Sequence, residues 1–102
     1  MKSQVDTNDD VVCITLEGDI DLEFSGQVRE VLLDAVPRGR VIEVDMSGVT
    51  LIDSSGVASL LEALQRARKS GKDFILTQVQ DPVMRVLRLA RLETVFTIEN
   101  EP

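Results

Sequence analysis

The sequence predicts a single α/β domain in which helices pack against a mixed sheet of about five strands. First, apolar and β-branched runs of strand length alternate with segments whose apolar residues recur at helical spacing. Second, 102 residues are enough for one hydrophobic core and too few for two. The expected order is ββαβαβαβ, and this alternation predicts mostly parallel strands joined by right-handed crossovers. We expect one domain over residues 1–102, with its core over about 5–98.

The first half of the chain begins with a predicted hairpin over residues 3–17. Its turn is the Asn8-Asp9-Asp10 stretch, and its second strand is rich in β-branched residues. An apolar stripe at helical spacing then predicts a helix over residues 24–36. Pro37 and Gly39 are typical of the end of such a helix. The antiparallel hairpin should therefore add an edge to a parallel sheet.

Residues 41–46 form the predicted central strand of that sheet. The run is β-branched and mostly apolar, so we expect it to be nearly all buried, with both faces covered. A helix is predicted over residues 54–70, because its apolar residues fall on one helical face. These residues are Val57, Leu60, Leu61, Leu64 and Ala67.

The C-terminal part adds a strand, a helix and a last strand. A short strand is predicted over residues 74–77. The following helix, over residues 82–90, has Asp81 as its expected N-cap and Pro82 in its first turn. Residues 95–98 form the last predicted strand.

Composition excludes several classes of function. The net charge of −7 and the absence of Trp and Tyr argue against nucleic-acid binding, which needs cations and stacking surfaces. The absence of His excludes an ordinary zinc site and a Ser-His-Asp hydrolase. We therefore expect neither catalysis nor a cofactor. The one cysteine, Cys13, alternates with apolar neighbours in a strand and should be a buried, reduced thiol.

Location follows from hydropathy. No apolar run approaches the roughly 20 residues that a membrane-spanning helix needs, so we expect no membrane insertion. The N-terminal residues also lack the apolar core of a signal peptide. We therefore expect the protein to lie in the cytoplasm.

Polar residues at the start of the second helix form the main candidate site. Asp53-Ser54-Ser55-Gly56 follows the central strand, and its carboxylate and hydroxyls are suited to capping free N–H groups. Helix capping alone is one interpretation, yet two adjacent hydroxyls exceed what one cap requires.

The roles of two other sets of polar residues also have to be considered. Asp19 and Asp21 leave the neighbouring strand, either toward the same edge of the sheet or simply as a turn and helix cap. Arginines at positions 85, 88 and 91 are interpreted as a solvated basic face.

These motifs, Gly18-Asp-Ile-Asp21 and Leu51-Ile-Asp-Ser-Ser-Gly-Val57 in a strand–loop–helix context, resemble the STAS domains of bacterial anti-sigma-factor antagonists. The resemblance extends from about residue 5 to residue 98. It implies a partner-switching regulator that binds an anti-sigma factor, a serine kinase of the GHKL type, when it is unphosphorylated. Phosphorylation would end binding, and a PP2C-type phosphatase would restore it.

The resemblance also implies roles for individual residues. The phosphorylated serine would be Ser54, and Asp21, Asp53, Ser55 and Gly56 would share its partner-binding surface. We expect the helix N-terminus to accommodate the added phosphate, because free N–H groups face it. Two alternatives remain: a STAS subunit of a lipid-transport (ABC-type) complex or unphosphorylated scaffold, and a nucleotide-binding or enzymatic domain.

Overall fold

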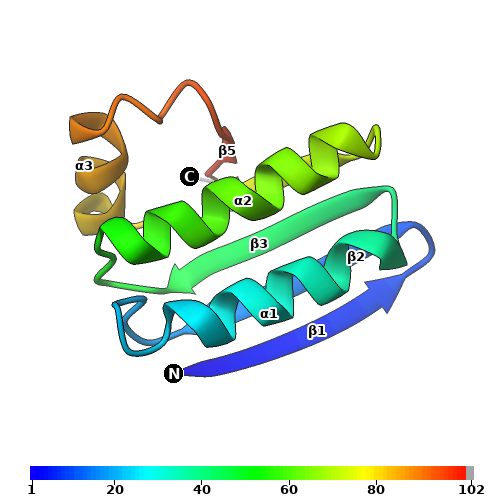
Figure 1. Cartoon of the computed structure of the whole chain (residues 1–102), viewed down its shortest axis with the longest axis horizontal. Coiled ribbons are helices and arrows are strands. Elements are labelled where there is room, and N and C mark those ends of the chain that lie inside the picture. The colour runs from blue at the N-terminus through cyan, green and yellow to red at the C-terminus, as the bar shows by residue number, and fades with distance from the viewer. Residues whose placement is uncertain (101–102) are drawn as a thin grey trace.

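The strands and helices follow the predicted order ββαβαβαβ. The structure, a computed structural model, describes residues 1–100. The elements are β1 (Lys2–Asn8), β2 (Val11–Glu17), α1 (Ser25–Ala35), a 3₁₀ turn (Val36–Arg38), β3 (Val41–Gly48), α2 (Ser54–Lys69), β4 (Asp73–Thr77), α3 (Asp81–Leu89) and β5 (Thr97–Glu99) (Figure 1).

All five strands belong to one mixed sheet. They are ordered β1-β2-β3-β4-β5, so β3 is the central strand as predicted. The hairpin strands β1 and β2 pair antiparallel, whereas the pairs from β2 through β5 are parallel. The carboxyl ends of β2, β3 and β4 therefore meet at one edge of the sheet, from which the loops to the helices leave.

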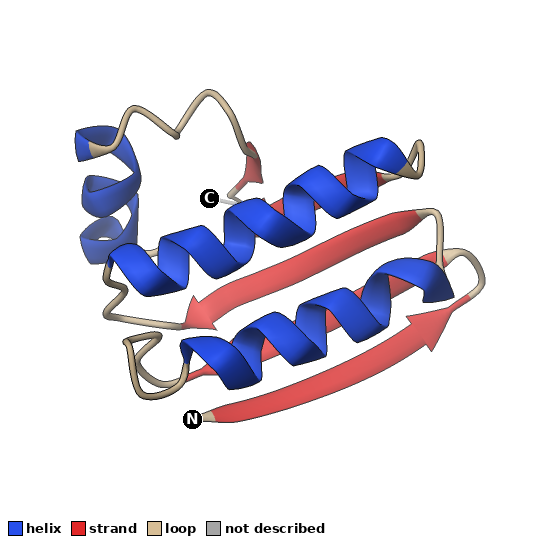
Figure 2. Cartoon of the chain, in the orientation of Figure 1, coloured by secondary structure: helices blue, strands red, loops and turns tan. Residues whose placement is uncertain are grey.

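The sheet is covered by long helices on one face only. Figure 2 shows α1 and α2 side by side on the same face, with α3 standing near the beginning of α2. The strand residues beneath them are buried: Val12, Ile14, Leu16, Ile42, Val44 and Met46. Residues of the opposite face, including Cys13, Glu43 and Asp45, are only half-buried. The prediction that the central strand is covered on both faces is therefore wrong.

The strand order explains this one-sided covering. From β2 to β5 each parallel strand is added on the same side of the previous one. Successive right-handed crossovers in one direction place their helices on one face, because covering the second face requires the direction to reverse. Cys13, on the open face, is accordingly half-buried and not fully buried as predicted.

Element boundaries agree with the predictions within a few residues. Three details differ: the burial of one residue on α2, the N-cap of α3 and the start of β5. On α2, Leu60 and Leu64 are buried, but Leu61 is only partly buried against the core. On α3, the N-cap is Gln80 and Asp81 is the first helical residue. The last strand begins at Thr97 and not at residue 95, because the backbone N–H groups of residues 95 and 96 bond back to the carbonyl of Leu92 in a turn.

Candidate functional site

Two loops at the carboxyl edge of the sheet are joined to each other. Ile20, after β2, and Ile52, after β3, form an isolated parallel bridge. The N–H of Ile20 donates to the carbonyl of Leu51 at 2.9 Å, and the N–H of Asp53 donates to the carbonyl of Ile20 at 3.2 Å. Both isoleucine side chains are buried. The bridge therefore fixes the Asp19–Asp21 segment next to the start of α2, which is one of the two interpretations that the sequence left open.

The Asp53 carboxylate connects α2 to the preceding loop. Its Oδ1 accepts hydrogen bonds from the Ser55 N–H (2.9 Å), the Ser55 hydroxyl (2.5 Å) and the Gly56 N–H (3.1 Å), which makes Asp53 the N-cap. Its Oδ2 accepts from the N–H of Leu22 at 3.0 Å. These donors, the Ser55 hydroxyl first, hold the pKa of the Asp53 carboxyl below its ordinary value because they stabilise the charged form. One side chain thus caps the helix and holds the loop against it.

Gly56 is required at its position by close packing. A Cβ atom there would lie 2.6 Å from the carbonyl oxygen of Ile20 and 2.7 Å from side-chain carbons of Ile20 and Ile52. Any larger residue would separate α2 from the bridged loops. The glycine of the motif therefore serves the geometry of the site and is itself buried.

The two adjacent serines are held differently. The Ser55 side chain is half-buried, and its hydroxyl donates to Asp53. Ser54, the first residue of α2, is exposed, and within residues 1–100 its hydroxyl has no hydrogen-bond partner. A modifying enzyme could therefore reach the Ser54 oxygen, whereas the Ser55 oxygen belongs to the cap.

Asp21 has a visible structural role. Its Oδ1 accepts from the N–H groups of Glu23 (3.1 Å) and Phe24 (3.3 Å), and its carbonyl accepts from Phe24 and Ser25 at the start of α1. The turn interpretation is therefore correct at the level of structure, whereas the N-cap of α1 is Phe24 and not an aspartate. Asp21 itself is half-buried and lies between the bridged Ile20 and Leu22, whose N–H donates to Asp53, so all five predicted site residues belong to one edge of the sheet.

Two exposed leucines border the site and were missed from the sequence. The side chains of Leu22 and Leu51 are 79% and 53% exposed. In the sequence Leu51 and Ile52 both look like loop anchors, but only Ile52 is buried. The sequence alone does not distinguish the two residues. In the structure Ile52, which forms the bridge with Ile20, is buried, and Leu51 is exposed.

Other chemistry finds little support in the described part of the chain. No group of three or more Cys, Asp or Glu residues within residues 1–100 is arranged to hold a metal ion. Over the same residues, no helix is long and apolar enough to cross a membrane.

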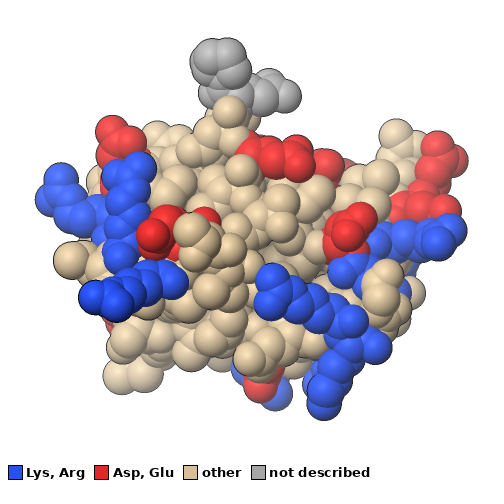
Figure 3. All heavy atoms as spheres, turned by 90° about the horizontal axis from the view of Figure 1, so that it is seen from above, with Lys and Arg blue, Asp and Glu red and all other residues tan. Residues whose placement is uncertain are grey.

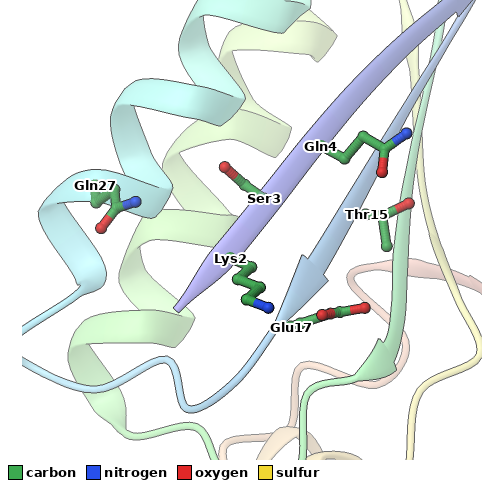
Figure 4. Close-up of a pocket in the computed structure, with 6 residues that line it drawn as sticks. All are labelled: Lys2, Ser3, Gln4, Thr15, Glu17 and Gln27. Carbon is green, nitrogen blue, oxygen red and sulfur yellow. The ribbon is translucent and has the colours of Figure 1, made fainter.

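A hollow of about 390 Å³ lies at the edge strand β1. Its lining residues are Lys2, Ser3, Gln4, Thr15, Glu17 and Gln27 (Figure 4). The Lys2 and Gln4 side chains are on one side of β1 and Ser3 is on the other, toward Gln27, so the hollow straddles the strand and does not form one enclosed site.

Comparisons with known proteins place the motif in context. The chain is 26% identical over 92 residues to the anti-sigma-B factor antagonist of Listeria monocytogenes, an alignment that covers 89% of this chain and 81% of the relative. The unphosphorylated form of the anti-sigma factor antagonist SpoIIAA superposes with a TM-score of 0.83 at 20% identity, covering 99% of this chain and 89% of SpoIIAA. The phosphorylated form of the Bacillus SpoIIAA gives a TM-score of 0.77 at 19% identity, covering 99% and 92%.

The family itself is set by the match to a family model described as "Mlab, STAS domain", which extends over residues 3–98. That range includes the whole sheet apart from the ends of β1 and β5, all three helices and the bridged loops. The Asp53 cap, the close-packed Gly56 and the strand order thus lie in a chain that belongs to the STAS-domain family.

Proposed function

We propose that this STAS domain is an anti-sigma-factor antagonist that switches partners by phosphorylation of Ser54. When unphosphorylated, it binds an anti-sigma factor that is also a serine kinase of the GHKL type. Phosphorylation of Ser54 ends that binding, and a PP2C-type phosphatase restores it. The protein acts in the cytoplasm as a binding module, without catalysis of its own.

The observation that carries this proposal is the contrast between the two serine hydroxyls. Ser54 presents a free, exposed oxygen at the start of α2, whereas the Ser55 hydroxyl is bonded to Asp53. A kinase needs an accessible hydroxyl that can be oriented for in-line attack, and it supplies ATP, Mg²⁺ and the base itself. The curated relative is named as an antagonist, and SpoIIAA is known in unphosphorylated and phosphorylated forms, which supports the same use of this fold here.

The site is also suited to switching without unfolding. Ser54 bonds to no part of the core in the described residues, so a phosphate there changes the charge and size of the surface and leaves the packing of α2 in place. A phosphate adds roughly −1.5 to −2 charges, beside the Asp53 carboxylate and in a protein of net charge −7. The phosphate therefore changes the size and the charge of the surface to which the partner binds.

The direct test uses the serine kinase that co-purifies with the protein from its host. Incubation with this kinase and ATP should add one phosphate, which mass spectrometry should map to Ser54. Ser54→Ala should accept none and should bind the kinase permanently, whereas Ser54→Asp should bind more weakly. Ser55→Ala is the matched control, which should still be phosphorylated although its cap is weaker.

Two results would refute the proposal. The first is a phosphate mapped to Ser55. The second is a protein that no host serine kinase binds or modifies and that co-purifies with a transporter ATPase instead.

That second result would favour the alternative, a STAS subunit of a lipid-transport complex. One observation supports it: the matching family model is described by the name Mlab and not by that of an antagonist. In this function the same edge of the sheet would bind an ATPase without phosphorylation, and Ser54→Asp would weaken that complex while no phosphate would be found on the native protein.

A further inference from the structure

We propose that Leu22 and Leu51 are the apolar anchors of the partner-binding surface, and that a phosphate on Ser54 ends binding because it places an uncompensated charge beside them. The inference rests on the proposed function and specifies its partner: a protein with an apolar pocket for the two leucines, bordered by Lys or Arg side chains. It also assigns a physical cause to the direction of the switch.

The exposure of the two leucines is the first step. In the described residues the exposed large apolar side chains are Leu22, Leu51 and Leu89, at 79%, 53% and 80%. Two of these three lie in the bridged loops that lead to Ser54. Single exposed leucines are ordinary on a protein surface, but two on a pair of bridged loops beside a polar site can provide the apolar centre that a specific interface needs.

The two leucines are also held rigidly. The Leu51 carbonyl accepts from the N–H of Ile20, and the Leu22 N–H donates to Oδ2 of Asp53. Both backbones are thus fixed before any partner arrives. Binding then orders few additional groups, which favours affinity because less conformational entropy is lost.

The charges around the leucines indicate what should border the partner's pocket. No Lys or Arg occurs between residues 3 and 28, whereas Asp19 and Glu23 lie on either side of Leu22 in the sequence and are exposed. Asp21 and Asp53 add two carboxylates to the same loops. Since complementary potentials favour encounter and select the partner, the partner should present cations around an apolar pocket.

The hydrogen bonds of α2 explain why a phosphate would remain uncompensated. The Ser55 and Gly56 N–H groups, which could otherwise face a phosphate, already donate to Oδ1 of Asp53. The expectation that free N–H groups at the helix start would accommodate the phosphate is therefore wrong for these two donors. The modified Ser54 would present a nearly full dianion to the apolar part of the interface, away from the cations at the border of the partner's pocket. Burying the phosphate there would cost desolvation as well as repulsion from Asp53.

The experiment measures binding of the co-purified serine kinase to purified variants by titration calorimetry. Leu22→Ser and Leu51→Ser should each weaken binding by about thirtyfold, the ratio that corresponds to an interface hot spot. Leu22→Met, which keeps an apolar side chain of similar volume, should bind within about threefold of wild type. Leu89→Ser, at the last residue of α3 and equally exposed, is the matched control and should also stay within about threefold. Thermal denaturation should show all variants folded, because the substituted side chains are exposed.

The outcomes separate this inference from the proposed function. If the kinase binds wild type and phosphorylates Ser54 but binds Leu22→Ser and Leu51→Ser as tightly as wild type, the anchors are wrong and the switch stands. If Leu89→Ser weakens binding and the other two do not, the partner occupies α3 and the inference is overturned. If no serine kinase binds wild type, the proposed function fails and this inference fails with it.

Discussion

At the scale of single residues, the site depends on one carboxylate that does two tasks. Oδ1 of Asp53 receives the donors of α2, and Oδ2 receives the Leu22 N–H from a loop that is far away in the sequence. Capping could be predicted from the sequence, because Asp before Ser-Ser-Gly is a typical N-cap arrangement. The second bond could not, since it depends on the bridge between Ile20 and Ile52.

The two tasks of Asp53 can be separated with Asp53→Asn and Asp53→Ala. Asparagine is a good N-cap, but it has only one acceptor oxygen. If that oxygen caps α2, the NH₂ group faces the Leu22 N–H and the bond to Leu22 is lost; in the opposite orientation the cap is lost. Asp53→Ala loses both bonds, so its melting temperature should fall further than that of Asp53→Asn. An equal loss in both variants would mean that the cap contributes nothing beyond the bond to Leu22.

Titration of Asp53 gives a separate prediction about pH. The pKa of Asp53 is lowered in the folded state, so the ionised carboxylate stabilises the fold. This contribution to the free energy of unfolding is fully present above the ordinary pKa of 3.8 and is lost as the pH falls through the lower folded pKa. The difference in melting temperature between wild type and Asp53→Asn should therefore narrow only below about pH 4. Asp34→Asn, on the exposed side of α1, controls for the loss of one negative charge.

Gly56→Ala tests the close packing of α2 on the bridged loops. The new methyl would lie 2.6 Å from the Ile20 carbonyl oxygen, so α2 or the loop must shift, at a cost of about 1–3 kcal/mol in the free energy of unfolding. Gly26→Ala is the control, because no atom lies within 4 Å of the corresponding Cβ on α1. It should stabilise the protein by about 0.4–1 kcal/mol, because alanine restricts the unfolded chain. Chemical denaturation of both variants would show whether the contact matters, and an unchanged Gly56→Ala would contradict it.

At the scale of elements, helical periodicity predicted which side of a helix is buried better than it predicted how wide the buried side is. The pattern placed Leu60 and Leu61 together on the buried face of α2, but Leu60 is fully buried and Leu61 is only partly buried. Periodicity gives the direction of a stripe, and the width of the contact depends on the neighbours, which here are the sheet and α1. The start of β5 was displaced for a different reason, since the N–H groups of residues 95 and 96 bond to the carbonyl of Leu92 in a local turn.

Comparing Leu60→Ala with Leu61→Ala tests where the buried face of α2 ends. Leu60→Ala leaves a cavity in the core and should lower the free energy of unfolding by about 2–5 kcal/mol. Leu61→Ala should cost clearly less, because part of its side chain is in contact with water in the native state. Urea titration of both proteins checks the order, and equal losses would mean that Leu61 is as buried as its neighbour.

At the scale of the whole molecule, the charges are unevenly distributed along the chain. Seven of the eleven Lys and Arg residues fall between positions 66 and 91, with only two of the eighteen acidic residues. Viewed from above, positive side chains lie at the left, in the lower middle and at the right of the molecule, and negative side chains lie beside those at the left and the right (Figure 3). The element order was predictable because runs of strand length alternate along the sequence with segments of helical periodicity. The uncovered face was not predictable in this way, since it depends on the direction in which strands are added to the sheet.

The reactivity of Cys13 tests the electrostatics of that uncovered face, where Cys13 lines a hollow of about 320 Å³ with Glu43 and Asp45. Burial, followed by the negative charges of Glu43, Asp45 and Asp6, raises the pKa of the Cys13 thiol. Since only the thiolate reacts, iodoacetamide should alkylate folded Cys13 more slowly than the same thiol in urea-unfolded protein at the same pH. The Glu43→Gln, Asp45→Asn double variant should react faster than wild type, because two of the charges that disfavour the thiolate are gone. Asp34→Asn on α1 removes a charge from the other face and should leave the rate unchanged. Equal rates in the double variant and wild type would show that burial alone protects the thiol and that the open face exerts no field on it.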